Sequence, residues 1–271
     1  MKRLRSSVPT LLAYACALVF FFPVLLLLLT GFKTEAQAYS MPPSLLFTPT
    51  LENFARAFEQ NYYLYYLSNS IIVVGVSTLL AFALSIPAAF SLAFYPTRRS
   101  KDVVFWVLST RFMPPVGVVV PLYAIFLKIN LLDTRTGLII IYTAFSIPLM
   151  VLIMRAYYLD LPREIVEAAQ VDGASLWRVF FSIAVPLSGP AIASAGLLSL
   201  IFVWNEFFFA LMLTDTNAPT LPLFMSQSQT SKGLFWANMS ASATMAVLPV
   251  VVLGWFAQRY LTRGFTMGAV K

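Results

Sequence analysis

The chain has 271 residues, of which 59% are hydrophobic and only 11% are charged, and its mean hydropathy is +0.81. No ordinary soluble domain has this composition, so we expect an integral membrane protein. The chain contains no histidine and one cysteine, Cys16, which excludes a disulfide framework, HExxH zinc chemistry and Ser-His-Asp catalysis. The formal net charge of +7 is spread over separate segments, which is unlike a basic patch for nucleic acid.

Six stretches of the sequence are long and apolar enough to cross a hydrocarbon core of about 30 Å as helices. They show helical periodicity or are apolar on all sides. We therefore predict an all-α integral membrane protein with six transmembrane helices, built as a single domain over residues 1–271. The spans are expected near residues 10–32, 66–95, 103–127, 137–154, 187–214 and 239–258.

The first span has features of a signal peptide. It follows a basic head, and Ala36-Gln37-Ala38 imitates a cleavage site. However, its apolar run from Thr10 to Phe32 exceeds the usual signal-peptide core of about 7–15 residues. We expect the segment to be kept as a transmembrane helix.

The lysine and arginine residues are distributed unequally between the two sets of loops. With the N-terminus inside, the inner segments hold twelve of them and the outer segments five, and Arg111 lies inside a span. Positive residues favour cytoplasmic loops. We therefore expect both termini and the 155–186 loop in the cytoplasm.

The 155–186 loop is the most polar internal segment of the chain and is expected to form a helix-turn-helix. Arg163–Val171 consists of good helix formers, with Glu164 near the positive end of the helix dipole. Gly173 can adopt a positive φ and end this helix. A second helix, Ala174–Val185, has apolar residues at a spacing that gives one apolar face.

The first of these two helices carries residues suited to contact with another protein. The small side chains of Ala168 and Ala169 allow close approach of a partner's backbone, and Glu167 can pair with a partner's cation. These residues point to a docking element. The alternative left by the residues alone is a solvated connecting loop.

Polar residues inside the spans are candidates for a transport pathway. Arg111 lies about eight residues into the third span and Glu206 about nineteen into the fifth, so straight helices would hold them about 16 Å apart in depth. This separation argues against a direct ion pair. Pro114 and Pro115 are expected to break the third span just beyond Arg111 and to free carbonyl groups near it.

Some polar residues of the spans are also candidates for contact with a ligand. Asn205 and Glu206, with Asn69 near the outer end of the second span, can hydrogen-bond a hydroxylated ligand. Intramembrane charges usually face a cavity or the interior of a helix bundle. The alternative for Glu206 is a gate or a structural bond between helices, and for Arg111 a structural role is favoured.

The polar loop resembles the EAA loop of the permease subunits of bacterial ATP-binding-cassette importers. Glu167-Ala168-Ala169, Asp172-Gly173-Ala174 and Pro186 match that loop at its characteristic spacing. Over nearly the whole chain, further motifs are similar to the maltose-type carbohydrate permeases. These motifs are Thr50-Leu51-Glu52-Asn53, Asn69-Ser70, Pro114-Pro115, Pro121-Leu122-Tyr123, Trp204-Asn205-Glu206-Phe207 and the tail from Arg263 to Lys271.

The resemblance implies a transport subunit without enzymatic activity, forming half of a translocation pore in the bacterial cytoplasmic (inner) membrane. It implies a heterodimer with a second permease subunit, two ATPase subunits that bind ATP and Mg, and an extracytoplasmic solute-binding protein. This chain lacks the GxxxxGK[ST] loop of ATP-binding proteins and is expected to hold no cofactor or metal itself. The residues expected to couple to the ATPase are Glu164, Glu167, Ala168, Ala169, Asp172, Gly173, Gly268 and Lys271.

The transported ligand is expected to be a carbohydrate. Val103–Tyr123, Leu132-Asp133-Thr134 and Gly233–Ala237 look similar to permeases for polyols such as sorbitol or mannitol, and related subfamilies move oligosaccharides, glycosides or glycerol phosphates. An ion-coupled secondary transporter of a polar solute is the alternative, although one glutamate and no histidine in the spans offer little for ion coupling. A membrane-embedded enzyme would need a clustered catalytic set, which the sequence does not contain.

Overall fold

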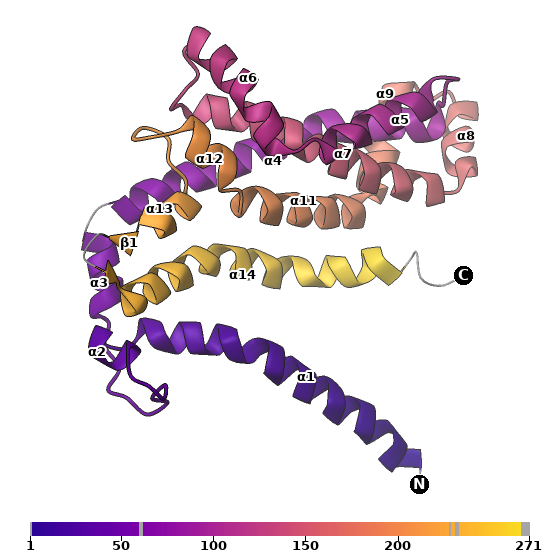
Figure 1. Cartoon of the computed structure of the whole chain (residues 1–271). Coiled ribbons are helices and arrows are strands. Elements are labelled where there is room, and N and C mark those ends of the chain that lie inside the picture. Colours follow the sequence, from indigo (N-terminus) through magenta and orange to yellow (C-terminus); the bar gives the residue numbers. More distant parts are fainter. Residues whose placement is uncertain (1, 60–61, 228, 231–232, 267–271) are drawn as a thin grey trace. The chain divides into compact units, whose positions relative to one another are not determined.

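The computed structural model describes residues 2–59, 62–227, 229–230 and 233–266, and this part of the chain is almost entirely helical (Figure 1). The chain divides into two compact units, which are described separately. The first consists of Met1–Tyr65 and Phe224–Pro249, and the second of Tyr66–Leu223 and Val250–Lys271.

The elements follow one another mostly as helices joined by short turns. Up to the middle of the chain they are α1 (Lys2–Gly31), α2 (Glu35–Ala38), α3 (Glu52–Glu59), α4 (Tyr62–Phe94), α5 (Ser100–Ser109), η1 (Thr110–Phe112), α6 (Pro115–Lys128) and α7 (Arg135–Asp160). The later elements are α8 (Arg163–Val171), α9 (Leu176–Val179), η2 (Phe180–Ala184), α10 (Val185–Leu187), α11 (Gly189–Trp204), α12 (Phe208–Leu213), α13 (Leu221–Gln227), β1 (Gln229–Thr230), β2 (Gly233–Leu234) and α14 (Trp236–Thr266). The two short strands pair antiparallel.

Within the described residues, four helical segments are long and apolar enough to cross a membrane. They are Thr10–Gly31, Tyr63–Phe94, Arg135–Asp160 and Trp236–Trp255. Two bent helix pairs raise the number to six if each pair is one span. Four of the predicted spans overlap the four continuous segments, and the other two overlap the bent pairs.

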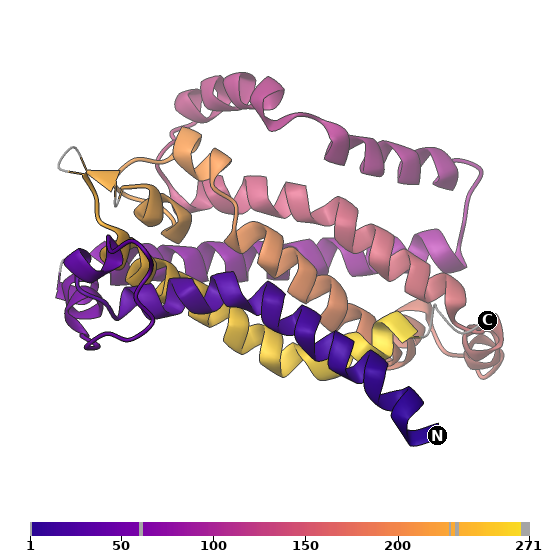
Figure 2. The same cartoon turned by 60° about the horizontal axis from the view of Figure 1, so that its bottom comes forward.

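The third predicted span is broken at its proline pair. Ser100–Phe112 and Pro115–Lys128 meet at 92°. The break between α5 and α6 can be followed in Figures 1 and 2. Pro114 is extended, with φ −64° and ψ 126°, and Pro115 opens the first turn of α6. Proline has no N–H to donate and restricts the residue before it to extended backbone, so the helix ends here as the sequence predicts.

The fifth predicted span differs from the single helix expected over residues 187–214. At its start the chain bends by 71° between Leu176–Leu187 and Gly189–Trp204. α11 then ends at Trp204, and α12 begins only at Phe208. Glu206 therefore lies in a non-helical break and is not embedded in a continuous helix.

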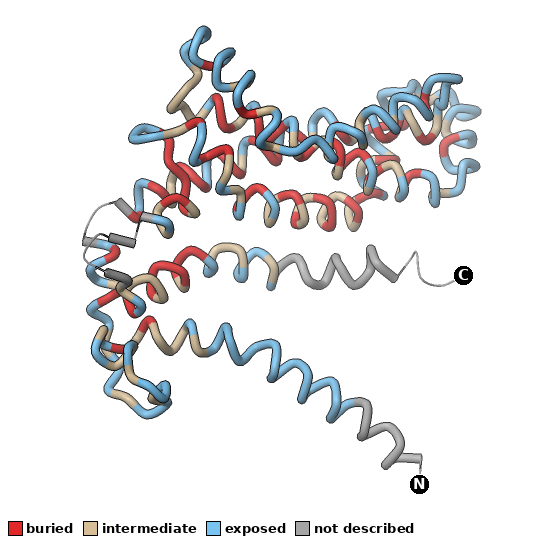
Figure 3. Tube along the Cα trace, in the orientation of Figure 1, coloured by how far each residue is buried: buried red, intermediate tan, exposed pale blue. Residues whose placement is uncertain are grey.

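The core of the second unit forms between α4, α7 and α11. Both α7 and α11 are apolar on nearly every side, and many of their side chains are buried (Figure 3). Gly196 lets α11 approach α4 closely, because a Cβ at this position would lie 2.7 Å from the ring of Phe82. Met150 and Met154 of α7 are fully buried in the same core.

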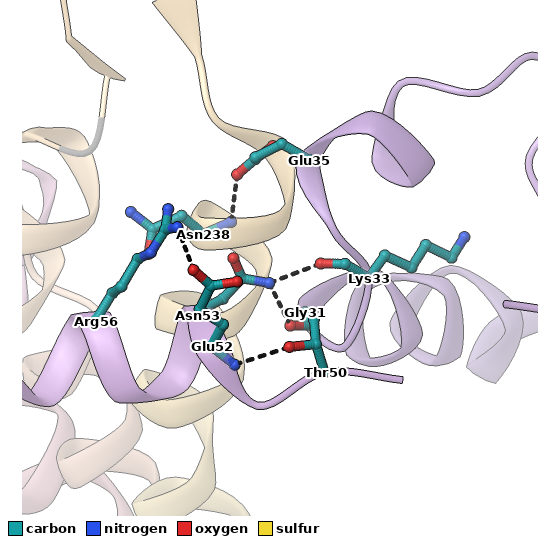
Figure 4. Close-up of polar contacts among 8 residues, drawn as sticks. All are labelled: Gly31, Lys33, Glu35, Thr50, Glu52, Asn53, Arg56 and Asn238. Atoms are coloured by element: carbon teal, nitrogen blue, oxygen red, sulfur yellow. Dashed lines mark hydrogen bonds and ion pairs between the residues drawn. The ribbon is translucent and has the colours of Figure 1, made fainter. Parts of the chain in front are cut away.

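In the first unit, the Thr10–Gly31 part of α1 is apolar on nearly all sides and largely exposed (Figure 3). A helix of this kind is suited to a hydrocarbon surrounding. At its end, the buried Asn53 side chain donates hydrogen bonds to the carbonyls of Gly31 and Lys33, at 3.0 and 2.7 Å (Figure 4). Glu52 N–H donates to Thr50 Oγ1 at 3.2 Å, at the start of α3.

A second polar contact in this unit fixes the start of α14. The Glu35 carboxylate accepts a hydrogen bond from the backbone N–H of Asn238 at 3.0 Å (Figure 4). It also accepts one from Ala237 N–H at 3.1 Å. These amides belong to the first turn of α14, where helical N–H groups have no partner within the helix. Glu35 thus stabilises the helix start electrostatically as well as by hydrogen bonding.

Candidate functional site

The turn after α8 forms a complete Schellman motif. Gly173 has φ +80°, and its N–H donates to the Gln170 carbonyl at 3.0 Å. Ala174 N–H donates to the Ala169 carbonyl at 2.9 Å. These are the two bonds that satisfy the last carbonyls of a helix when a glycine follows it in the left-handed region. The helix expected over Arg163–Val171 is present with those bounds.

The α8 helix has a distinct inner and outer face. Val166 is buried against the core of the second unit, and Ala169 packs against the same core. Glu164, Glu167 and Ala168 are exposed. Asp172 and Gly173 extend this exposed surface into the turn. Most of the coupling candidates therefore lie on one accessible surface, while Ala169 is partly buried.

Aromatic side chains hold the segment from α8 to α10 against the transmembrane helices. The ring of Phe90 in α4 lies 5.3 Å from that of Phe180 in η2 and 5.7 Å from that of Tyr158 in α7. Edge-to-face and tilted pairs at such distances contribute about 0.5–1.5 kcal/mol each beyond burial. The Gln170 side chain also donates to Tyr95 Oη at 2.6 Å.

The bend before α11 is fixed by two tyrosines of α7. Tyr157 Oη donates to the Leu187 carbonyl at 2.7 Å. Tyr158 Oη and Ser188 Oγ lie 3.2 Å apart and share a hydrogen bond. Both contacts end at the point where Leu176–Leu187 and Gly189–Trp204 meet at 71°. The start of α11 is thus held by α7, which is also the helix that precedes α8.

The second predicted helix of the loop begins later and is less regular than expected. α9 starts at Leu176, where the Ser175 side chain accepts from Arg178 N–H. It continues as a π-helical turn over Phe180–Ala184. Short π-helical turns frequently occur at functional sites. Trp177 and Phe181 stack on the exposed side of this segment, with ring centroids 5.8 Å apart.

A cavity of about 180 Å³ lies in the second unit between η1, α7 and the end of α11. Most of its wall surface is apolar, and we call it the polar cavity because Arg111 and Glu206 border it. It brings together two of the four candidate pathway residues, Arg111 and Glu206. Its lining residues are Arg111, Tyr142, Phe145, Ser146, Leu149, Ser199, Phe202, Val203 and Glu206.

Glu206 connects the break after α11 to α7 and to α12. Its Oε2 accepts a hydrogen bond from Tyr142 Oη at 2.7 Å. The same carboxylate accepts from Phe209 N–H at 3.1 Å and from Ala210 N–H at 3.4 Å. A carboxylate on the first amides of a helix satisfies donors that have no partner within that helix. Glu206 therefore acts as a cap for α12 and presents its carboxylate to the cavity.

Arg111 reaches the cavity from the bend in the third span. Its Nη1 donates to the Phe145 carbonyl at 2.9 Å, and its guanidinium lies 5.1 Å from the centre of the Phe202 ring. In the part of the chain that the structure describes, Arg111 and Glu206 form no ion pair. The broken spans nevertheless bring both residues to one cavity, which the straight-helix estimate of their separation did not anticipate.

Asn69 and Asn205 are not among the residues that line the cavity. Asn69 is fully buried, donates to the Pro219 carbonyl at 2.9 Å and accepts from Arg135 Nε at 2.7 Å. Asn205 is exposed, and its side chain donates to the Ile201 carbonyl at 2.8 Å. The geometry favours a structural role for Asn69 and a helix-ending role for Asn205.

Asp133 organises a loop that the sequence did not single out as a site. It has φ 55°, and its carboxylate accepts hydrogen bonds from the backbone of residues 215–218 and from the side chain of Asn217. Burial by itself raises the pKa of this carboxyl, but the hydrogen bonds from Asp215, Asn217 and Ala218 outweigh it and lower the pKa. Its own N–H donates to the Leu213 carbonyl at 2.8 Å.

Sequence reasoning missed most of the cavity wall. Tyr142, Ser146 and Ser199 lie within apolar runs, and their side chains carry no local signal of a shared site. A polar side chain in a transmembrane stretch is the one signal available, because such groups need a partner or a cavity. The predicted coupling residues Gly268 and Lys271 lie outside the described residues.

Residues 85–267 match the protein family described as "Binding-protein-dependent transport system inner membrane component". The chain is 38% identical over 267 residues to the "Probable ABC transporter permease protein y4oR" of Sinorhizobium fredii, covering 98% of this chain and 96% of the relative. It is 34% identical over 273 residues to the "Melibiose/raffinose/stachyose import permease protein MelC" of Bacillus subtilis, covering 97% and 95%.

Among solved structures, a bacterial ABC transporter involved in the import of the acidic polysaccharide alginate contains a chain with the same fold. The TM-score is 0.78 at 19% sequence identity, and the match covers 96% of this chain and 97% of that one. At this identity the similarity establishes the helical arrangement and no more.

Proposed function

Because the chain belongs to the family of inner-membrane components of binding-protein-dependent transport systems, we propose that it is a permease subunit of an ATP-driven carbohydrate importer. In this role the chain forms half of a translocation pore and carries out no bond chemistry. A membrane location agrees with the four apolar helices and two bent helix pairs of its described part.

The observation that carries the coupling proposal is the exposed surface of α8 and its turn. Glu164, Glu167 and Ala168 face outward, and Asp172 and Gly173 continue the surface. The inner face of the same helix packs in a core formed with α4 and α7. Gln170 also donates a hydrogen bond to Tyr95, the residue that follows α4. A partner that binds the outer face therefore pushes or pulls on the transmembrane helices directly.

We assign the outer face of α8 to a separate ATPase. Glu167 would pair with a cation on that partner, and Ala168 would allow close approach of its backbone. When ATP closes the ATPase dimer, the segment from α8 to α10 would move with it and the pore would open outward. ATP hydrolysis would then reset the transporter, so each cycle is an alternating-access step.

The complete transporter would contain this chain, a second permease subunit, two ATPase subunits and an extracytoplasmic solute-binding protein. Both termini and the α8–α9 segment would lie in the cytoplasm, as the distribution of lysine and arginine indicates. The ligand class follows from relatives such as the melibiose, raffinose and stachyose import permease, which is why we propose a carbohydrate. A polyol such as sorbitol or mannitol is the specific candidate.

The first experiment is a mild-detergent purification of the tagged chain from its native membranes, with partners identified by mass spectrometry. Wild type is compared with Glu167→Arg, which reverses one charge on the outer face of α8. The matched control is Asp102→Arg, the same reversal at an exposed position in the first turn of α5. We expect wild type and the control to retain an ATPase and a second permease.

The Glu167→Arg variant is expected to lose the ATPase and keep the second permease. This result would support α8 as the ATPase-binding surface, and the co-purified binding protein would then be screened for its ligand. A wild-type chain that purifies without an ATPase would refute the importer. A Glu167→Arg variant that keeps the ATPase would refute the assigned surface.

A further inference from the structure

The polar cavity contains hydrogen-bonding capacity that the described residues do not use. The guanidinium of Arg111 has five N–H donors, and the hydrogen bond that it makes in the described part of the chain uses Nη1. Among the described residues, the Oε1 atom of Glu206 accepts a hydrogen bond from Phe209 N–H, which also contacts Oε2. Donors and an acceptor thus face one small space without pairing to each other.

Ser199 contributes another unused polar group to the wall of the cavity. It is 1% exposed, and its Oγ has no hydrogen-bond partner among the described residues. An unpaired buried hydroxyl is unfavourable by about 1–3 kcal/mol. Because its Oγ has almost no accessible surface, Ser199 is part of the wall and not a contact for a ligand in the cavity as the structure shows it.

The remaining wall is apolar and partly aromatic. The side chains of Phe145 and Phe202 border the cavity, and Phe202 is 54% exposed, so the space is open on its side. Binding sites for small molecules commonly combine apolar and aromatic walls with a few convergent polar groups. At about 180 Å³, this cavity is smaller than the roughly 300–1,000 Å³ of sites for drug-sized ligands. It can hold one small ring or a short chain.

We propose that this cavity is a binding site for one polyhydroxylated unit, a single sugar ring or a short polyol, held between Arg111 and Glu206. Hydroxyl groups both donate and accept hydrogen bonds, so neighbouring hydroxyls satisfy the arginine donors and the glutamate acceptor together. The apolar C–H face of the same ligand packs against Phe202. The inference rests on the proposed function and assigns ligand contact to this subunit.

The charge of the cavity argues against an apolar side chain of a partner as its occupant. Such a side chain would bury the Arg111 donors and the Glu206 acceptor without replacing their hydrogen bonds to water, which is costly. A hydroxylated ligand replaces those bonds. The cavity is large enough for several water molecules when no ligand is bound, since a water molecule's share of liquid volume is about 30 Å³.

The test uses chemical labelling of a single cysteine in the purified complex. Cys16 is the only cysteine of the chain, so Cys16→Ser gives a chain free of thiols. Leu149→Cys then places a thiol in the cavity wall, and Leu152→Cys places one on the same helix outside the cavity. Labelling by methyl methanethiosulfonate is followed by the mass of this chain.

The rate is measured with sorbitol, glucose or maltose present, and with glycine betaine at equal osmolality as the additive control. We expect at least one polyhydroxyl compound to slow labelling of Leu149→Cys by threefold or more, with glycine betaine having no effect. Leu152→Cys should label at an unchanged rate. Adding Arg111→Gln should abolish the protection.

Equal rates with every compound would overturn the site, and so would protection that persists with Arg111→Gln. A Leu149→Cys thiol that never reacts in the complex would also overturn it, because a partner subunit would then fill the cavity. ATP-driven uptake by the Cys16→Ser complex is measured in parallel. Uptake without protection refutes only the cavity site, whereas a complex without an ATPase refutes the proposed function.

Discussion

The phenol of Tyr142 donates a hydrogen bond to Glu206 Oε2 at 2.7 Å and so joins α7 to the break between α11 and α12. The break is stable because the same carboxylate also accepts from the first amides of α12. One side chain therefore holds three helical segments together beside the polar cavity.

Replacing Tyr142 by phenylalanine is predicted to loosen this junction. The change removes a hydrogen bond to a carboxylate, which contributes about 1.5–3 kcal/mol, and leaves the caps on α12 in place. We expect a lower thermal unfolding temperature of the purified complex and slower transport per ATP hydrolysed. The measurement is a thermal unfolding curve together with the ratio of uptake to ATPase rate.

Tyr123→Phe is the control for the Tyr142 prediction. Tyr123 lies in α6, and its hydroxyl makes no hydrogen bond within the described part of the chain. Removing this hydroxyl should leave the unfolding temperature and the ratio of uptake to ATPase rate close to wild type. An unfolding temperature for Tyr142→Phe equal to that of the control would contradict the stabilising role of the bond.

Asp133 is predicted to make the loop at residues 215–218 sensitive to acid only below about pH 4. Its pKa is lowered from an ordinary value of 3.8, so its contribution to stability is fully present above 3.8 and is lost as the pH falls through the folded-state value. Asp133→Asn should therefore loosen the loop at every pH above 4. Limited proteolysis of the loop between pH 3 and pH 7 measures this.

Asp215→Asn is the matched control, because Asp215 is exposed and offers Asp133 only its backbone N–H. It should leave the cleavage rate unchanged. If the loop of Asp133→Asn is as resistant to protease as wild type at pH 7, the hydrogen bonds to Asp133 do not hold the loop.

Gly173→Ala is predicted to weaken the turn after α8. No atom lies within 4 Å of the position that a new Cβ would occupy, so the whole effect comes from φ +80°. A non-glycine residue in this region costs about 1–2 kcal/mol. We expect faster hydrogen exchange over residues 163–187 and reduced retention of the ATPase.

Gly189→Ala provides the comparison, because its Cβ also meets no atom and its backbone is not in the left-handed region. This variant should behave as wild type. Equal exchange rates in the two variants would show that the left-handed turn is not what orders the segment.

Gly196→Ala is predicted to separate α11 from α4. The added Cβ would lie 2.7 Å from Phe82, too close for a normal contact, so the ring or the helix must move. Overpacking of this kind costs about 1–3 kcal/mol. Gly75→Ala adds a methyl group to α4 with no atom within 4 Å and should be neutral. Thermal unfolding of the two purified complexes distinguishes them, and equal unfolding temperatures would contradict the close approach.

The features of this fold that local residues determine could be predicted from the sequence. Arg163–Val171 and the turn at Gly173 follow from helix formers and a glycine C-cap, and the break at Pro114 and Pro115 follows from proline geometry. The 92° angle at that break could not be predicted, because it depends on how the helices on either side pack.

The break at Asn205–Phe207 could not be predicted because one of the hydrogen bonds that hold it comes from a distant part of the chain. The segment contains neither glycine nor proline, and it is held by the Tyr142 hydroxyl from a distant helix. The meeting of Arg111 and Glu206 at one cavity was missed for the same reason. In straight helices the two residues would lie far apart in depth, whereas in the structure, with both spans broken, they line the same cavity.

The most direct test of the importer is uptake by proteoliposomes that contain the purified complex and its binding protein. Uptake of the carbohydrate found on that binding protein is measured with ATP available to the ATPase, and again after ionophores have collapsed all ion gradients. The account predicts uptake that requires ATP and continues with the ionophores. Uptake that stops with the ionophores, or that proceeds without ATP, would contradict it and favour an ion-coupled transporter.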